Sequence, residues 1–167
     1  SVTGLALAVE PVTIRTNVMV FSPTGGTVAD ANLDGTELEF GTGVEQSDVL
    51  DIDAGNTNAT VVADLARAEA VPDASFDCFI LTQTLQFIYD LPAAVGHAAR
   101  ILKPGGVVLC TLPTVSRIAR RYLEREYWRF TAQSLGRLLG EEFGAGNVEV
   151  EAYGNVLAST AFLQGLC

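Results

Sequence analysis

The chain has 167 residues, of which 49% are hydrophobic and 18% are charged. This length suits one compact domain with its own apolar core, and the composition excludes a disordered or fibrous chain. Twenty Asp and Glu against ten Lys and Arg give a formal net charge of −10, which argues against a protein that binds the nucleic-acid backbone through a basic face. We therefore expect a single domain over residues 1–167 that has no nucleic-acid partner.

The few basic residues gather in the second half of the chain, where five arginines fall between residues 117 and 129: Arg117, Arg120, Arg121, Arg125 and Arg129. Two interpretations stay open for this run. It can form the solvated face of a helix, with nearby glutamates as partners, or it can form an anion-binding rim above a substrate pocket.

Cysteine and histidine usage indicates neither disulfides nor metal binding. Cys78, Cys110 and Cys167 stand far apart, and a single histidine, His97, cannot build a histidine-based metal site. We expect a reducing, cytoplasmic location. No apolar run reaches the roughly 18 residues of a membrane helix, and Ser1–Val9 lacks the basic start of a signal peptide. The missing initiator methionine predicts a processed chain or a fragment.

Apolar runs bounded by turn residues predict a series of strands. Residues 11–21 have a strand-like composition that ends at Ser22-Pro23, and clearer strands are expected at 27–31, 44–48, 60–63, 76–81 and 106–111. Between the last two, residues 91–103 form a helix by pattern. Pro92 suits its first turn, and Pro104-Gly105-Gly106 ends it.

The remaining chain predicts one more helix and one more strand. Thr131 is a plausible N-cap for a helix through Phe143 with Gly144 after it, and Val148–Val150 alternates with acids as a strand does. Solid apolar strands that alternate with helices indicate an α/β fold with an open, mostly parallel sheet and helices on both faces. Such sheets bind ligands beyond the carboxyl ends of their strands, where the strand order reverses.

Three ordered blocks carry a family resemblance. They are VVADL at 61–65, VPDASFDCFILTQTLQFIYDL at 71–91 and RILKPGGVVLCTLP at 100–113. Together they resemble the Rossmann-like core of class I S-adenosylmethionine-dependent methyltransferases, in particular the small-molecule group called type 11. YWRFT at 127–131 and VEVEAYGN at 148–155 resemble later segments of the same group. By this resemblance residues 26–155 form the core, residues 1–25 match poorly, and residues 156–167 are too short for the helix and reversed strand that close the family's sheet, which predicts a truncated C-terminal end.

The resemblance implies a set of residues that bind S-adenosylmethionine. Asp48 ends the expected second strand, where the family places the acid that holds the cofactor ribose. Asp64 and Leu65 follow the third strand, where the adenine lies, and Thr82 and Gln83 follow the fourth. Either aspartate can instead be a helix N-cap or an exposed acid, and Thr82 and Gln83 can be plain turn residues.

The family's glycine-rich loop after the first strand is degenerate in this chain. Asp30 can stand for its leading acid, but Asn32 and Asp34 occupy positions where glycine is expected. Both residue types tolerate positive φ. Their side chains would nevertheless crowd the cofactor, and Asp34 would repel the cofactor's carboxylate.

The methyl acceptor is predicted to lie near residues 127–129. Tyr127, Trp128 and Arg129 are weak candidates for substrate contacts, and the alternative for the aromatic cluster of this segment is core packing. No catalytic residue is assigned, because methyl transfer needs alignment more than a base, and His97 lies in the middle of a helix. We expect methyl transfer to a small-molecule acceptor, with no metal. The alternative is a silent methyltransferase-like module that serves as a partner or scaffold domain.

Overall fold

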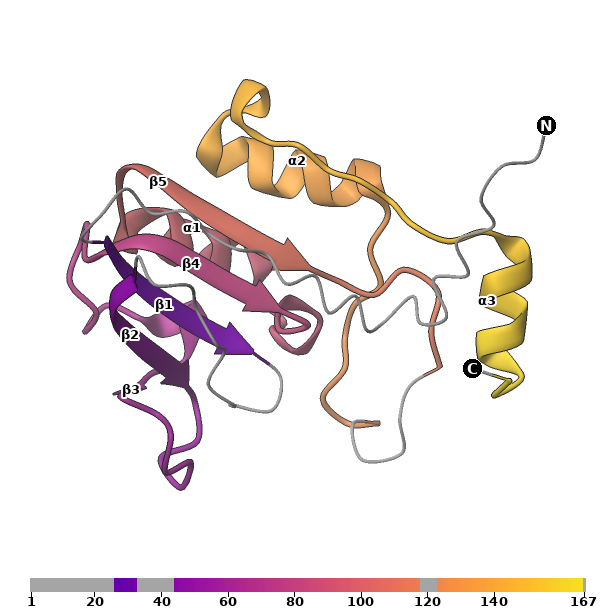
Figure 1. Cartoon of the computed structure of the whole chain (residues 1–167), viewed down its shortest axis with the longest axis horizontal. Helices are drawn as coiled ribbons and strands as arrows, with labels where there is room; N and C mark the ends of the chain where they lie inside the picture. The colour runs from indigo at the N-terminus through magenta and orange to yellow at the C-terminus, as the bar shows by residue number, and fades with distance from the viewer. Residues whose placement is uncertain (1–25, 33–43, 118–122, 167) are drawn as a thin grey trace.

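The computed structural model describes residues 26–32, 44–117 and 123–166. Five strands form the centre of the fold: β1 (Gly26–Asn32), β2 (Val44–Asp51), β3 (Val61–Val62), β4 (Phe76–Thr82) and β5 (Leu102–Thr111) (Figure 1). Three helices accompany them: α1 (Leu91–Ile101), α2 (Ala132–Phe143) and α3 (Val156–Leu163). The described residues also form three short 3-10 turns: η1 (Leu65–Arg67), η2 (Leu85–Phe87) and η4 (Ala145–Asn147).

The strands pair in the order β3-β2-β1-β4-β5, and every pair is parallel. The chain therefore builds outward from β1 to β3 and then returns to the other side of β1 with β4. Strand order reverses between β1 and β4, and this places the ligand-binding crevice of the fold above the carboxyl ends of these two strands. The expected Rossmann-like α/β fold is confirmed.

The five clearer strand predictions are confirmed, with shifted ends. The strand expected at 44–48 continues to Asp51, and the one expected at 60–63 is limited to Val61–Val62. The strand-like segment at 11–21 lies outside the described residues. The strand predicted at 148–150 is wrong, because this segment has no regular structure. Val148 packs against the core cluster and Val150 lies next to Gly136 of α2, so helix contacts satisfy the alternating apolar pattern.

The Lys103-Pro104-Gly105-Gly106 segment forms a bulge at the start of β5. The helix before it ends at Ile101, two residues earlier than expected, and Leu102 already pairs with Phe76 while Val107 pairs with Cys78. A Cβ at Gly106 would lie 3.0 Å from the backbone oxygen of Asp77, so the close approach of the two strands requires glycine there. Lys103 Nζ bonds to Asp77 Oδ2 at 2.7 Å across the bulge.

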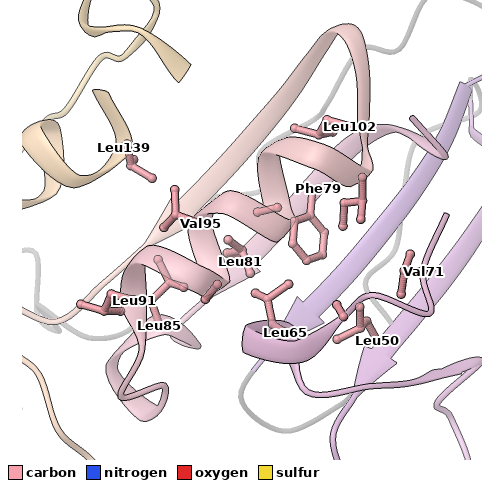
Figure 2. Packing of buried hydrophobic residues seen from close by; sticks show 14 of the residues in the cluster. Leu50, Leu65, Val71, Phe79, Leu81, Leu85, Leu91, Val95, Leu102 and Leu139 are labelled. Carbon is pink, nitrogen blue, oxygen red and sulfur yellow. The ribbon is translucent and has the colours of Figure 1, made fainter. Parts of the chain in front are cut away.

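The core lies between the sheet and its helices (Figure 2). Phe79 and Leu81 of β4 are 0% and 1% exposed, and they pack with Val95 of α1 and Leu65 of η1. Each such side chain contributes about 1.5–3 kcal/mol through burial. Alternation along β4 turns Cys78 and Ile80 to the opposite face. The helical cover expected on that face stays a prediction, because the segments before β1 and between β1 and β2 lie outside the described residues.

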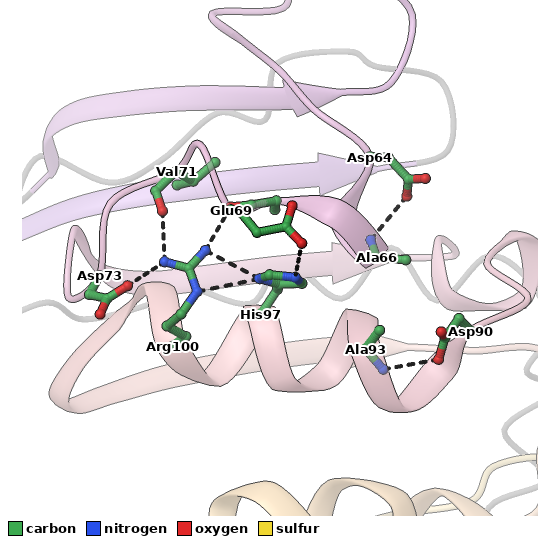
Figure 3. Close-up of polar contacts among 10 residues, drawn as sticks. Asp64, Ala66, Glu69, Val71, Asp73, Asp90, Ala93, His97 and Arg100 are labelled. Carbon is green, nitrogen blue, oxygen red and sulfur yellow. Dashed lines mark hydrogen bonds and ion pairs between the residues drawn. The ribbon is translucent and has the colours of Figure 1, made fainter.

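Arg100 of α1 fastens the β3–β4 connection to the helix (Figure 3). Its guanidinium donates to the backbone oxygens of Val71 at 2.7 Å and Ala68 at 2.6 Å, and it pairs with Asp73. Charged donors satisfy these carbonyls more strongly than neutral ones would. This connection leads from the end of β3 to the start of β4, so Arg100 stabilises the crossover that brings β4 beside β1.

The helix predicted after Thr131 is confirmed as α2. The Thr131 hydroxyl accepts from the backbone N–H of Ser134 at 3.1 Å, and Ser134 Oγ accepts from the backbone N–H of Thr131 at 3.0 Å in a capping box. Gly144 follows the helix with a φ of 81°, which favours glycine. Of the segment after residue 155, the described part forms the single helix α3. No described helix is long and apolar enough to span a membrane.

Candidate functional site

Polar residues end three adjacent strands at the same level. In the strand register Thr82, the last residue of β4, pairs with Asn32 of β1 on one side and with Thr111 of β5 on the other. Asn32 and Thr82 flank the point where strand order reverses. Their position is therefore the one at which an open α/β sheet holds its ligand. Asn32, predicted in the glycine-rich loop, and Thr82 and Gln83, predicted after the fourth strand, lie at this edge.

Gln83 continues from β4 in an unusual backbone conformation. Its φ is 53°, in the left-handed region that non-glycine residues rarely adopt. The backbone N–H donates to Thr111 O at 2.9 Å, and the side-chain Nε2 donates to Thr111 Oγ1 at 3.4 Å. Residues held in this region cluster at ligand-binding sites, because the surrounding structure must offset their cost.

Gln86 lies beneath Gln83 and is 2% exposed. Its Nε2 donates to Gln83 Oε1 at 3.4 Å, and its own Oε1 has no hydrogen-bond partner among the described residues. A buried acceptor without a partner costs about 1–3 kcal/mol. Gln86 Oε1 can therefore still accept a hydrogen bond close to the switch point, the place between β1 and β4 where the strand order reverses.

The predicted position of Asp48 at the end of the second strand is wrong. Asp48 lies inside β2 opposite Ala29, three residues or about 10 Å before the strand ends. Its carboxylate accepts from Thr60 Oγ1 at 2.9 Å and from Gln46 Nε2 at 3.0 Å. Asp48 is therefore hydrogen-bonded to two neighbouring side chains within this part of the sheet.

Asp51 is the acid that ends β2, and sequence reasoning missed it. The register pairs Asp30 with Val49, so two further residues bring Asp51 level with Asn32. The Asp51 carboxylate is half-buried and accepts from the backbone N–H of Asp53 at 2.9 Å and from Asn56 Nδ2 at 2.7 Å. The available signal was the apolar pair after Asp48, because Val49 and Leu50 continue the strand.

Asp64 and Leu65 follow β3, and the two have different roles. Asp64 is half-buried and caps η1 by accepting from Ala66 N at 3.0 Å (Figure 3), which is the N-cap alternative considered from the sequence. Leu65 is 3% exposed and packs into the core (Figure 2). The expectation that its side chain offers a face to a ligand is wrong, because the core already covers it.

The expected glycine-rich loop falls mostly outside the described residues. Asp30 lies in β1 two residues before its end, level with Ile80 of β4, and Asn32 is the last residue of the strand. Asp34 belongs to residues 33–43, outside the described part of the chain. The role of Asp30 as the leading acid stays a prediction.

The segment after β5 returns to the same edge. The backbone N–H groups of Tyr127 and Trp128 donate to Gln86 O at 2.8 and 3.3 Å. Arg129 bonds to Ser116 O and pairs with Glu126 at 2.8 Å. Core packing, the alternative for the aromatic residues here, holds for Phe130, which is 6% exposed, whereas Tyr127 and Trp128 are 52% and 36% exposed.

His97 lies away from this edge, in the middle of α1 (Figure 3). Its Nδ1 lies 3.3 Å from Arg100 Nε, and its Nε2 lies 3.7 Å from Glu69 Oε1. These contacts give His97 a structural position beside Arg100. No group of three or more His, Cys, Asp or Glu suited to a metal ion occurs among the described residues.

Comparison with known proteins assigns the family. A family profile described as "Methyltransferase domain" matches residues 14–150, and the chain belongs to this family. It is also 24% identical over 110 residues to the ubiquinone/menaquinone biosynthesis C-methyltransferase UbiE of Caulobacter vibrioides, a match over 54% of this chain and 44% of that protein. The chain thus spans less than half the length of this relative. The class I S-adenosylmethionine-dependent methyltransferase domain recognised in the sequence is confirmed, and the finer type 11 assignment stays a prediction.

Solved structures share the fold. A chain in the complex between the Haloferax volcanii Trm112 methyltransferase activator and the putative methyltransferase superposes with a TM-score of 0.58 at 16% identity, over 85% of this chain and 79% of that chain. Haemonchus contortus phosphoethanolamine N-methyltransferase 2, in complex with phosphomonomethylethanolamine and S-adenosylhomocysteine, gives 0.54 at 17% identity, over 85% and 44%. At such identities the likeness concerns the fold alone.

S-adenosylmethionine is the cofactor of this class, and the described edge suits it. An adenosyl group presents hydroxyl and amine donors, and Asp51 and Asp64 supply acceptors at the end of β2 and just after β3. A carboxylate can accept about four hydrogen bonds, and from neighbouring groups Asp51 accepts two and Asp64 accepts one. The acidic edge also suits the positive sulfonium.

Proposed function

We propose that this chain, as one domain over residues 1–167, transfers a methyl group from S-adenosylmethionine to a small-molecule acceptor. The observation that carries the proposal is the level row of Asn32, Thr82 and Thr111 at the switch point, with Gln83 held in the left-handed region beside it. Free Cys78 and Cys110 favour a cytoplasmic location.

Residues at different places along this edge contact different parts of the cofactor. Asp51 and Asp64 accept hydrogen bonds from the adenosyl group, and Asn32, Thr82 and Gln83 orient the part that carries the methyl group. Asp30 and Asp48 lie further back along their strands: Asp30 is two residues and Asp48 three residues before its strand's end. When bound, the cofactor would supply a methyl group on a sulfonium; the acceptor's oxygen or nitrogen would form the new bond, the electron pair of the broken bond would stay on sulfur, and the acceptor's proton would pass to water.

The acceptor is held by the segment after β5. Tyr127 and Trp128 are exposed above Gln86, and Arg129 is fixed by Ser116 O and Glu126. Alignment of the two reactants supplies up to about 7–11 kcal/mol of the acceleration in favourable cases. The chain therefore needs no general base in the transfer itself.

Calorimetry with S-adenosylhomocysteine tests the proposal. We expect binding to the unchanged chain and at least tenfold weaker binding to Asp64→Ala, with Glu141→Ala, an exposed acid of α2, as the matched control. Transfer of labelled methyl groups to a set of small hydroxyl and amine compounds then tests activity. Absence of heat at high micromolar ligand would overturn the proposal.

A silent partner module is the second candidate. The structural likeness to a chain of a complex with a methyltransferase activator favours it, as do Asn32 and Asp34 at the glycine positions. It predicts no binding of S-adenosylhomocysteine, together with retained folding by circular dichroism. Calorimetry thus separates the two functions in one measurement.

A further inference from the structure

Three aromatic rings contact one another at the surface beside the candidate site. The Tyr89 ring centroid lies 5.4 Å from that of Tyr127 and 5.8 Å from that of Trp128. These side chains nevertheless remain exposed, Tyr89 by 71%, Tyr127 by 52% and Trp128 by 36%. We call Tyr89, Tyr127 and Trp128 the aromatic platform. A patch of large exposed rings marks a binding surface more often than a scattered apolar residue does.

Hydrogen bonds fix the aromatic platform above the carboxyl ends of β4 and β5. Trp128 Nε1 donates to Ile88 O at 3.0 Å, and the backbone of residues 127–128 is bonded to Gln86 O, four residues after the end of β4. Phe130 N donates to Pro113 O at 3.0 Å, two residues after the end of β5. The Trp128 ring and the backbone that carries Tyr127 are therefore held in place before a ligand binds, which lowers the entropy cost of binding.

The distances and angles between the rings restrict which ligands can contact them. Rings at 5.4 and 5.8 Å already contact each other, which leaves no space between them to enclose a cation. The Tyr89 and Trp128 planes differ by only 31°, so their faces have similar orientations, as offset stacking with one flat partner requires. The acids next to the rings in sequence are engaged elsewhere: Asp90, after Tyr89, caps α1 at Ala93 N, and Glu126, before Tyr127, pairs with Arg129.

We propose that the methyl acceptor carries a planar, uncharged aromatic ring, which stacks on the aromatic platform and so presents its hydroxyl or amine group to the switch point. This inference rests on the proposed function and adds Tyr89, a residue that follows η2 and precedes α1, to the acceptor site.

Calorimetry with 2-naphthol and its saturated analogue decahydro-2-naphthol tests the inference on the full chain. We expect 2-naphthol to bind and the saturated analogue to bind at least fivefold more weakly. Tyr89→Ala and Tyr127→Ala are each expected to weaken 2-naphthol binding about 2- to 10-fold. Tyr89→Phe keeps the ring and the affinity. Tyr153→Ala is the matched control, because Tyr153 is 56% exposed and lies outside the aromatic platform.

The position of the ligand has its own readout. Trp128 is the only tryptophan of the chain, so its single indole N–H signal in nitrogen-labelled protein is expected to shift on addition of 2-naphthol. Equal binding of the saturated analogue, equal effects of Tyr89→Ala and Tyr153→Ala, or tighter binding of tetramethylammonium would overturn the inference. Ring-dependent binding of 2-naphthol without binding of S-adenosylhomocysteine would support the aromatic platform and overturn the proposed function.

Discussion

The backbone N–H of Gln83 donates to the backbone oxygen of Thr111 at 2.9 Å while Gln83 holds a φ of 53°. The bond joins the residue that follows β4 to the last residue of β5, next to the aligned residues Asn32, Thr82 and Thr111. A left-handed conformation costs a residue with a Cβ about 1–2 kcal/mol. This conformational cost falls at the carboxyl ends of the strands, the edge at which open α/β sheets bind their ligands.

Gln83→Gly is expected to have a free energy of unfolding about 1 kcal/mol higher than that of Gln83→Ala, because both variants lose the side-chain hydrogen bonds to Thr111 and Gln86 and only glycine adopts positive φ without the Cβ penalty. The same change removes the amide and is expected to weaken binding of S-adenosylhomocysteine. Urea unfolding and calorimetry measure the two effects. Gln83→Ala is the control, since it loses the amide but keeps the strain. Equal stability of the Gly and Ala variants would show that the backbone stores no strain.

Two thiols in the sheet are expected to be inert. Burial, with a smaller effect of the Asp77 carboxylate, raises the pKa of the Cys78 thiol to about 12, and burial raises the pKa of Cys110 to about 12. At pH 8 a thiol with this pKa is roughly 0.01% thiolate, and only the thiolate reacts.

A thiol-reactive dye in native buffer is therefore expected to leave Cys78 and Cys110 unlabelled, and guanidinium is expected to expose both. Mass spectrometry of the labelled peptides assigns each site, which keeps Cys167 apart from the other two. Rapid native labelling of Cys78, which is 0% exposed, would contradict the packing of β4.

The sheet could be predicted because its information is local. Phe76–Thr82 and Val107–Thr111 are mostly apolar runs bounded by turn residues, a pattern typical of strands in a parallel sheet, although Val107 of β5 is 46% exposed. The strand expected at 148–150 failed for a tertiary reason. Alternation shows that Val148 and Val150 share a buried side, but it does not show whether a strand or α2 covers them.

The site could be predicted only in part, because its geometry depends on register. The sequence indicated Asp48 as the acid that ends the second strand. The strand continues for three more residues, so Asp51 is the acid at its end. The positive φ of Gln83 has no sequence signature, since glutamine is not a residue typical of turns. Tyr89 meets Tyr127 and Trp128 because the backbone of residues 127–128 bonds to Gln86 O and Trp128 Nε1 bonds to Ile88 O, forty residues earlier in the chain, which no local pattern reveals.

Asp34, at the expected second glycine position, gives a test of the glycine-rich loop. Asp34 would bring a negative charge toward the cofactor's carboxylate, a contact that costs about 1 kcal/mol when it is partly desolvated. Asp34→Gly is therefore expected to tighten S-adenosylhomocysteine binding by up to about tenfold. Calorimetry beside Glu39→Gly, another acid of the same 33–43 segment, measures the effect. Unchanged affinity in Asp34→Gly, with binding lost in Asp64→Ala, would show that the loop alignment is wrong and the pocket correct.

The two acids of β2 give opposite expectations from sequence and from structure. Asp51→Asn is expected to weaken S-adenosylhomocysteine binding about 10- to 100-fold, because a hydrogen bond to a charged acceptor is worth about 1.5–3 kcal/mol. Asp48→Asn is expected to change it less than about twofold, since Asp48 lies inside the strand, three residues before the edge at which Asp51 ends β2.

Asp51 also holds the turn after β2, through Asn56 Nδ2 at 2.7 Å, so a control must separate the carboxylate from the turn. Asn56→Ala removes that bond and leaves the acid in place. If Asp51 acts on the cofactor directly, Asn56→Ala loses far less affinity than Asp51→Asn. Equal losses would reduce Asp51 to a support for the turn, and a larger loss in Asp48→Asn would restore the acid that the sequence first indicated.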